Sequence, residues 1–235
     1  MLAALRADVR AARDRDPAAR SSLEIVLSYP GVHAIWGHRA SNWLWRQGHT
    51  LSARLCAALI LRLTGVDIHP AAVLGPGLFI DHATGVVIGE TAEVGADVTI
   101  YHGVTLGGTS LNRGKRHPTV GDRVTIGAGA KVLGPITIGH DSRIGANAVV
   151  VKPVPPDSVV VGVPGHVISR RHARTATSPA DLDNAVLPDV VGVSLRALHD
   201  RIEELEARLD SVGPPRPATP RPPSTEVWYE QDFSI

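Results

Sequence analysis

Ile88-Gly89-Glu90-Thr91-Ala92-Glu93-Val94-Gly95-Ala96-Asp97-Val98-Thr99-Ile100 shows an aliphatic residue at every sixth position. This spacing runs through most of residues 66–165, at Ile68, Leu74, Ile80, Ile88, Val94, Ile100, Leu106, Val120, Ile126, Val132, Ile138, Ile144 and Val150. Eight of these are followed directly by glycine, at Gly75, Gly89, Gly95, Gly107, Gly121, Gly127, Gly139 and Gly145. A period of six fits neither a helix nor an alternating strand. It predicts a left-handed parallel β-helix, in which each hexad forms one face and one corner of a triangular prism, and small residues let the corner turn sharply. The alternative is an ordinary sheet with coincidental spacing.

The six-residue pattern slips at two places. The step from Ile80 to Ile88 is eight residues, which predicts a local bulge within residues 81–85. The step from Leu106 to Val120 is fourteen residues, which predicts a projecting loop within residues 107–117. Because interruptions of a regular solenoid are where binding groups tend to lie, both slips are candidate functional positions.

The flanking segments differ from the repeat and give the domain organisation. Residues 1–65 have apolar residues at helical spacing, with a break at Tyr29-Pro30-Gly31, and are expected to form an N-terminal helical domain. The β-helix catalytic domain is expected over residues 66–168. Residues 189–212 return to helix with a heptad seam, which indicates either a trimeric coiled coil or a helix lying on its own prism. Residues 213–235 form a Pro-rich linker and a flexible tail, so the fold class is α+β.

Composition excludes several classes of partner. With 24 basic and 23 acidic side chains the formal net charge is +1, so there is no electrostatic case for binding nucleic acid or a membrane. Cys56 is the only cysteine and lies in an apolar helical run, which suits a buried structural thiol and a cytoplasmic location. The N-terminus lacks the apolar core of a signal peptide.

Several blocks of the sequence resemble bacterial serine acetyltransferases, which belong to the hexapeptide-repeat acyltransferases. The blocks are Gly65-Val66-Asp67-Ile68-His69-Pro70, Asp81-His82-Ala83-Thr84-Gly85, Gly89-Glu90-Thr91-Ala92, Val104-Thr105-Leu106-Gly107-Gly108-Thr109, Arg116-His117-Pro118, Ile126-Gly127-Ala128-Gly129-Ala130-Lys131 and Gly162-Val163-Pro164-Gly165. The match runs from about residue 13 to residue 165. The resemblance implies transfer of an acetyl group from acetyl-coenzyme A to L-serine, the first step of cysteine biosynthesis.

The resemblance implies that His82 is the general base and that Asp67 orients it. An alcohol is too weakly acidic to attack a thioester unaided at neutral pH, and a neutral imidazole suits the removal of its proton. Asp67 lies fifteen residues before His82, close to the eighteen residues of one coil, so the two side chains are expected within reach of a hydrogen bond. The alternative is a corner histidine satisfied by backbone and a turn-capping aspartate. No nucleophile for an acetyl-enzyme is apparent, which favours direct attack by serine.

The family pattern also points to four serine-binding residues. Asp16 and Asp81 suit the ammonium group of the amino acid, whereas Arg116, helped by His117, suits its carboxylate. The serine-binding role of Asp16 rests wholly on the resemblance, because the residues around Asp16 indicate by themselves only an acidic residue at the end of a helix. We therefore expect an amino-acid site built from both pattern slips and the helical region.

The coenzyme is expected along a prism edge between neighbouring subunits. The family analogy pairs its pantetheine with backbone groups of Gly108 and Ala128, and Lys131 is a candidate for its phosphates. No metal is expected.

The tail and the short helical region imply protein partners. The tail ends in Ile235, which resembles the C-terminal isoleucine that serine acetyltransferases insert into O-acetylserine sulfhydrylase (cysteine synthase); the alternative is a frayed end. The helical region is shorter than in long family members, so a homotrimer is expected, with a hexamer as the alternative. Rival functions are acetylation of homoserine or a sugar on the same prism, a non-catalytic regulator of cysteine synthase and, more weakly, a zinc-dependent carbonic anhydrase.

Overall fold

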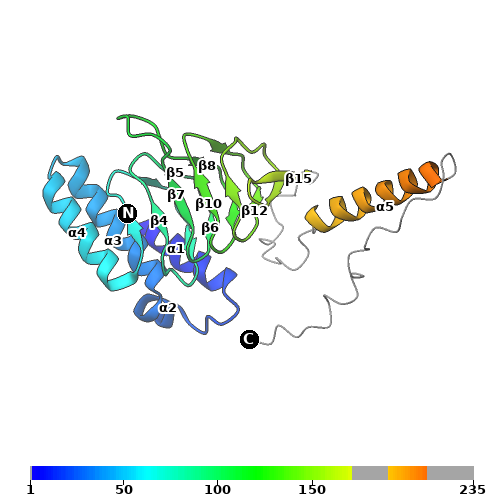
Figure 1. Ribbon diagram of the computed structural model, residues 1–235. Helices are drawn as coiled ribbons and strands as arrows, with labels where there is room; N and C mark the ends of the chain where they lie inside the picture. The colour runs from blue at the N-terminus through cyan, green and yellow to red at the C-terminus, as the bar shows by residue number, and fades with distance from the viewer. Residues whose placement is uncertain (1, 171–189, 211–235) are drawn as a thin grey trace. The chain divides into compact units, whose positions relative to one another are not determined.

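A computed structural model describes residues 2–170 and 190–210 of the chain (Figure 1). The chain divides into two compact units, Met1–Pro188 and Asp189–Ile235. The expected Pro-rich linker and the tail with Ile235 lie outside the described residues.

Four helices form the N-terminal region: α1 (Leu2–Arg15), α2 (Ser22–Ser28), α3 (Pro30–Arg46) and α4 (Thr50–Thr64). The Ser21 hydroxyl accepts a hydrogen bond from the Glu24 N–H and caps α2. Pro30 starts α3, where its missing N–H has no helical partner to lose. Gly65, in the left-handed conformation with φ 72°, ends α4. The helical N-terminal region expected from the sequence is present.

Short strands follow, most of them two residues long. They are β1 (Asp67–Ile68), β2 (Val73–Leu74), β3 (Phe79–Ile80), β4 (Val87–Ile88), β5 (Glu93–Val94), β6 (Thr99–Ile100), β7 (Thr105–Gly107), β8 (Thr119–Val120), β9 (Thr125–Ile126), β10 (Lys131–Leu133), β11 (Thr137–Ile138), β12 (Arg143–Ile144), β13 (Val149–Val150), β14 (Ser158–Val161) and β15 (His166–Arg170). From β1 to β13, successive strands go to successive sheets, and β14 and β15 both join the third: face A is β1-β4-β7-β10-β13, face B is β2-β5-β8-β11, and face C is β3-β6-β9-β12-β14-β15. All the strand pairs of the three faces are parallel except β14 with β15. The chain therefore winds as a three-sided parallel β-helix.

The aliphatic residue of each hexad fills the prism. On face A, Ile88 lies beside Leu106, Leu106 beside Val132 and Val132 beside Val150 in the strand register, and all four side chains are buried. Burying a side chain of this size contributes on the order of 1.5–3 kcal/mol. Of the positions quoted above, Leu74 alone is only half-buried.

The glycine that follows the hexad aliphatic is required by the distance between coils. A Cβ atom added to Gly121 would lie 2.7 Å from the backbone nitrogen of His140 in the next coil. The left-handed corner conformations fall at other positions, including Asp97 (φ 57°) and Asn147 (φ 54°). Glycine is thus needed at position 121 because neighbouring coils approach closely there, and not because the backbone adopts a left-handed conformation.

Buried charges fasten the helices to the prism and so position the segment after α1. Asp8 is fully buried, pairs with Arg39 at 2.9 Å and accepts a hydrogen bond from the Gly77 N–H at 3.1 Å. Burial raises the pKa of Asp8, and the contact with Arg39 opposes that rise. Arg15, at the end of α1, donates to the Val98 carbonyl at 3.2 Å. The residue that follows α1 is therefore held beside the prism.

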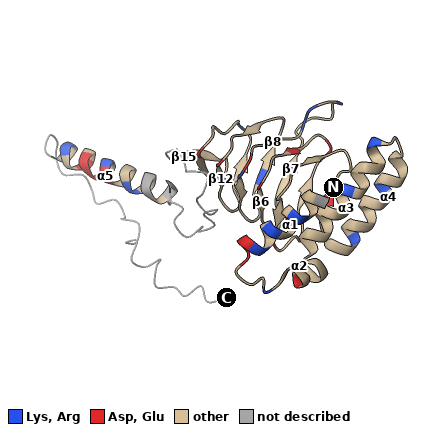
Figure 2. Cartoon of the chain, turned by 180° about the vertical axis from the view of Figure 1, so that it is seen from behind, with Lys and Arg blue, Asp and Glu red and all other residues tan. Residues whose placement is uncertain are grey.

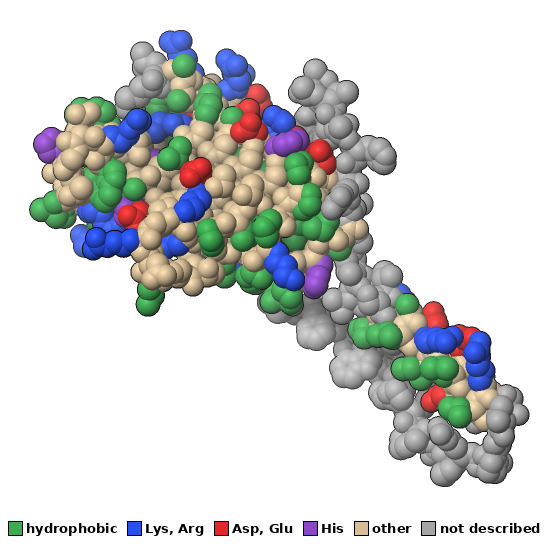
Figure 3. All heavy atoms as spheres, turned by 90° about the horizontal axis from the view of Figure 1, so that it is seen from above, with side chains coloured by type: hydrophobic (Ala, Val, Ile, Leu, Met, Phe, Trp, Pro, Cys, Tyr) green, Lys and Arg blue, Asp and Glu red, His purple; other side chains and the backbone are tan. Residues whose placement is uncertain are grey.

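The second unit contains the helix α5 (Val190–Asp210). From Leu195 onward its large apolar side chains are exposed and fall on one side of the helix, with charged side chains on the other (Figure 3): Leu195, Leu198, Ile202, Leu205 and Leu209. Among the described residues, no helix combines the length and the apolar character that crossing a bilayer requires.

Candidate functional site

The first pattern slip forms a tight bulge at the edge between faces C and A. His82 and Ala83 both adopt left-handed backbone conformations, with φ 56° and 52°. This geometry turns the His82 side chain outward, where it is 75% exposed, with Nε2 3.8 Å from Asp81 Oδ2. The edge of the His82 ring faces His102, with ring centroids 5.8 Å apart. The bulge predicted from the eight-residue step is present.

Asp16 and Tyr29 lie beside this bulge. The Tyr29 hydroxyl donates a 2.6 Å hydrogen bond to Asp16 Oδ2. Burial, that hydrogen bond and the nearby charge of Asp81 raise the pKa of Tyr29 to about 12, so the phenol stays a hydrogen-bond donor at neutral pH. We call Asp16, Tyr29, Asp81 and His82 the His82 corner.

The remaining polar residues lie elsewhere, in a hollow of about 900 Å³ between α4 and face A. The polar side chains lining it include those of Trp45, Arg54, Asp67, His69, Glu90, Arg116 and His117, and we call it the face A hollow. Glu90 and Arg116 form an ion pair across its wall, and the hydrogen bond from Arg116 holds the pKa of Glu90 below its ordinary value. Burial is the first cause of a lowered pKa at both His69 and His117.

The second pattern slip supplies part of this hollow. The segment between β7 and β8 projects from the prism as expected, and its basic residues are Arg113, Lys115 and Arg116 (Figure 2). Lys115 is tied back by bonds to the Thr91 carbonyl at 2.8 Å and to Glu93 at 2.9 Å. The end of the loop thus returns Arg116 and His117 to the edge between faces A and B.

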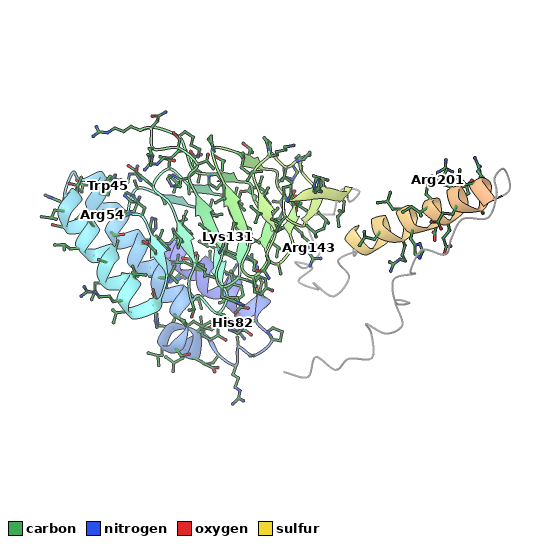
Figure 4. The ribbon with its side chains drawn as sticks, viewed as in Figure 1. Trp45, Arg54, His82, Lys131, Arg143 and Arg201 are labelled. Atoms are coloured by element: carbon green, nitrogen blue, oxygen red, sulfur yellow. The ribbon has the colours of Figure 1, made fainter. Side chains whose placement is uncertain are left out.

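The His82 corner and the face A hollow do not meet within one chain. Asp67 points outward from β1 on face A, whereas His82 lies at the edge between faces C and A, and among the described residues no hydrogen bond or ion pair joins them. Figure 4 shows His82 well away from Trp45 and Arg54, which line the hollow. The hydrogen bond expected from the fifteen-residue spacing is therefore absent from the single chain. The six-residue period places Asp67 on face A, but His82 lies in the eight-residue slip, where the period does not give the position of a side chain around the prism.

The expected coenzyme residues are also divided. Gly108 follows β7 and lies against Arg116 and His117, because a Cβ atom added there would be 3.3 Å from atoms of each. Ala128 lies at the edge between faces C and A, as His82 does. Lys131, on face A between the two edges (Figure 4), donates a hydrogen bond to the Gly103 carbonyl.

Three residues with contacts to the site were not assigned from the sequence: Tyr29, Glu90 and Thr91. Glu90 and Thr91 lie in the Gly89–Ala92 block that carries the resemblance, so a signal was present. Tyr29 was noted only as part of a helix break, and nothing in its spacing shows its bond to Asp16.

In the described part of the chain, one group of side chains has metal-ligand proximity. Ligand atoms of His140, Asp141 and Asp157 lie within 4.8 Å of one another. Asp141 is already paired with Arg123 through two contacts of 2.8 and 2.6 Å, which offset its charge. We therefore interpret these three residues as part of an ion-paired corner of the prism and not as a metal site.

Comparison with known proteins now identifies the family. The family model described as "Serine acetyltransferase, N-terminal" matches residues 1–36, and the model "Bacterial transferase hexapeptide (six repeats)" matches residues 117–152. A serine acetyltransferase of Mycobacterium tuberculosis is 63% identical over 235 residues, which cover 100% of both chains. One from Bacillus subtilis is 47% identical over 206 residues, 88% of this chain and 94% of its own. The chain belongs to the serine acetyltransferase family.

Solved serine acetyltransferases share the fold. The Neisseria gonorrhoeae enzyme in complex with serine has a TM-score of 0.69 and 47% identity, covering 71% of this chain and 68% of its own. The Brucella abortus enzyme in complex with coenzyme A has a TM-score of 0.71 and 48% identity, covering 73% and 68%. The identification made from the sequence, the fold class and the serine O-acetyltransferase activity are confirmed. The roles of individual residues stay predictions.

Proposed function

We propose that this serine acetyltransferase transfers the acetyl group directly, in a site that two copies of the chain complete together. The His82 corner of one copy would face the face A hollow of its neighbour. The proposal is carried by one observation: the groups needed for a single small substrate lie on two different edges of the prism.

The charges of the two halves support this arrangement. Serine at neutral pH carries an ammonium and a carboxylate group separated by one carbon. Asp16 and Asp81, at the corner, suit the ammonium, and Arg116 and His117, in the hollow, suit the carboxylate. The hollow also holds the carboxylates Asp67 and Glu90, but Glu90 is already paired with Arg116. The proposed base His82 is not in the hollow. A second copy would supply that base together with Asp16 and Asp81.

The chemistry needs one base and one oriented thioester. In the proposed reaction His82 takes the proton of the serine hydroxyl while its oxygen attacks the acetyl carbonyl of acetyl-coenzyme A. The tetrahedral intermediate then expels the coenzyme A thiolate, which receives the proton held by His82. Asp67 of the neighbouring copy hydrogen-bonds the neutral imidazole of His82, which fixes its tautomer, and then stabilises the imidazolium that forms. A backbone N–H near Gly108 is placed to stabilise the oxyanion.

The coenzyme is proposed to lie along the junction between the two copies. The Brucella relative was solved with coenzyme A, which supports acetyl-coenzyme A as the co-substrate. Gly108 from one edge and Ala128 from the other offer backbone groups to the pantetheine, and Lys131 lies on face A between them. No step of the proposed reaction calls for a metal.

We further propose a homotrimer, supported by α5. With Leu195, Ile202 and Leu209 at heptad position a, the opposing g and e positions hold Arg201 and Glu206. Parallel helices place these opposite charges side by side between copies, whereas antiparallel helices place Arg201 near Arg208 of the other chain. The exposed apolar side of α5 therefore fits a parallel coiled coil of like chains.

The C-terminal residue is proposed to bind O-acetylserine sulfhydrylase. An apolar side chain with a free carboxylate, on the Pro-rich arm of residues 213–235, suits insertion into an amino-acid site. Deleting Ile235 is expected to abolish binding to that enzyme in calorimetry and to leave acetyl transfer intact. Unchanged affinity would show that the tail is a free end.

The reaction is tested by following thiol release from acetyl-coenzyme A with serine, homoserine or a galactoside as acceptor. His82→Ala is expected to reduce turnover with serine by on the order of 10²–10⁴. If thiol release is faster with homoserine or the galactoside than with serine, serine is not the preferred acceptor and the proposed substrate is wrong. A burst of free coenzyme A before serine is added would contradict direct transfer.

The shared site is tested by mixing two impaired variants, one defective in proton removal and one in serine binding, and assaying them at a serine concentration well below the wild-type KM. In an equimolar mixture of His82→Ala and His117→Ala chains, refolded together, each mixed trimer contains one junction with both intact halves, so about a quarter of wild-type activity is expected. Arg116→Ala mixed with His117→Ala is the matched control. Both changes fall in the same half, so no junction is intact. If the first mixture is as inactive as the control, each site lies within one chain.

A further inference from the structure

The ring of His117 is held between two glycines and a threonine. His117 is 8% exposed, and a Cβ atom added to Gly89 would lie 2.0 Å from its Cδ2 and 2.1 Å from its Nε2. A Cβ atom on Gly108 would lie 3.3 Å from the same Nε2. The imidazole therefore occupies a slot that only glycine leaves open, and packing fixes its position.

The hydrogen bonds around Thr91 determine where the protons lie. Thr91 Oγ1 accepts hydrogen bonds from the backbone N–H groups of Arg116 at 3.0 Å and His117 at 3.1 Å. Because two donors occupy its lone pairs, the hydroxyl proton remains for the 2.9 Å contact with His117 Nδ1. The Thr91 N–H also donates to that Nδ1 at 3.2 Å. Both Thr91 donors therefore converge on the single lone pair of Nδ1, an arrangement that requires this nitrogen to carry no proton.

We propose that Thr91 is a positioning residue that holds His117 as the neutral tautomer with its proton on Nε2, as a hydrogen-bond donor to the serine substrate. This rests on the proposed function, in which His117 lies at the serine carboxylate. A proton on Nδ1 would face both donors of Thr91, so neither the other tautomer nor the imidazolium fits this setting. At Nε2 His117 can then donate but not accept, so it does not compete with His82 as the base for the serine hydroxyl.

The surrounding charges agree with a neutral ring. Burial lowers the pKa of His117, and the nearby cations Arg116 and Lys115 lower it further. Glu90 acts in the opposite direction, but its carboxylate is bonded to Arg116. These effects favour the neutral ring, and Thr91 selects its tautomer.

The tautomer can be read directly from the wild-type chain. Labelling the full-length protein with ¹⁵N-histidine and recording two-bond ¹H–¹⁵N spectra at neutral pH distinguishes protonated from unprotonated ring nitrogens. His117→Gln identifies the His117 signal by its disappearance. We expect a protonated Nε2 and an unprotonated Nδ1, and the opposite assignment overturns the proposal whether or not any Thr91 variant folds.

Two variants separate positioning from simple structural support. Thr91→Val removes the hydroxyl and keeps the shape and the backbone N–H that donates to Nδ1. It is expected to weaken the preference for the Nε2-protonated tautomer, so that the other tautomer becomes detectable, and to raise the serine KM by up to about tenfold, the effect of losing the hydrogen bond from His117 to serine. The acetyl-coenzyme A KM and kcat should change little. Thr91→Ser, which keeps the hydroxyl, should restore the wild-type spectrum and serine KM. A raised KM with an unchanged tautomer would refute the proposal.

Failure of the proposed function would look different. If His117→Gln leaves the serine KM unchanged, His117 does not bind serine and the proposed site is wrong. If His117→Gln raises that KM while Thr91→Val changes neither KM nor tautomer, only the role of Thr91 falls.

Discussion

His38 gives the structure a defined sensitivity to acid. It lies on α3 and is 4% exposed, and among the described residues neither ring nitrogen makes a hydrogen bond of good geometry. Backbone groups of Ala72 and His69 lie close enough to favour protonation, but their effect is smaller than that of burial. Arg39 and His69 are the charged and titratable neighbours that oppose its protonation. Burial, helped by Arg39, lowers the pKa of His38 to about 4.

The size of the effect follows from the difference between the folded and unfolded states. The unfolded chain takes up a proton at His38 near pH 6.5, whereas the folded chain resists it down to about pH 4. The free energy of unfolding is therefore unaffected by His38 above about pH 6.5. As the pH falls toward 4, protonation of His38 in the unfolded chain lowers that free energy progressively. At 1.36 kcal/mol per pH unit the full loss is about 3 kcal/mol, and about 2 kcal/mol of it is reached by about pH 5.

The assay is urea unfolding at a fixed protein concentration, comparing wild type with His38→Leu from neutral to mildly acidic pH. Leucine has a similar volume and does not titrate, and the carboxylates common to both chains contribute equally to both curves. The free energy of unfolding of the wild type should fall about 2 kcal/mol further than that of the variant by about pH 5. Parallel curves would show that His38 is solvated or paired, and the argument from burial would be wrong.

Three further substitutions test the packing. Gly89→Ala should displace the His117 ring, raise the serine KM at least about tenfold and, because the added methyl overpacks a buried slot, cost about 1–3 kcal/mol of stability in urea unfolding; unaltered steady-state kinetics would contradict the slot described for that ring. Asp8→Ala leaves the largely buried Arg39 unpaired and should cost about 3–5 kcal/mol in urea unfolding; a loss below about 1 kcal/mol would mean that water reaches the pair. Ile126→Ala empties a fully buried position of the prism and should cost about 2–5 kcal/mol by the same measurement, while a neutral result would mean that the coils close the gap.

The hexad pattern predicted most of the fold because the aliphatic residue at every sixth position recurs for a single reason, burial inside the prism. Ile126 and Val132 are buried where the period places them, and the eight-residue step before Ile88 is the bulge that exposes His82. The two interruptions of the period fall between strands, at edges of the prism. This is why the sequence could locate the candidate site residues near His82 and His117.

The contacts within the site were not predictable in the same way. A six-residue period specifies coil and face, but not which corner a returning loop meets, so the bond from Thr91 to His117 has no signature in spacing. Likewise, fifteen residues between Asp67 and His82 match one coil, yet the first side chain leaves from a face and the second from an edge. The bond of Tyr29 to Asp16 joins two helix ends whose mutual placement depends on packing against the prism.

The close stacking at Gly121 limits how such a chain can change in length. Adding or removing a single residue inside a hexad would rotate every later aliphatic side chain out of the prism and bring Cβ atoms against the backbone of the neighbouring coil. Insertions and deletions are thus confined to the ends of the coiled region and to the two places that already depart from the period, the bulge within residues 81–85 and the segment between β7 and β8. New acceptor specificity would have to arise there, by reshaping the loop that carries Arg116, while the ladder of coils stays constant in length.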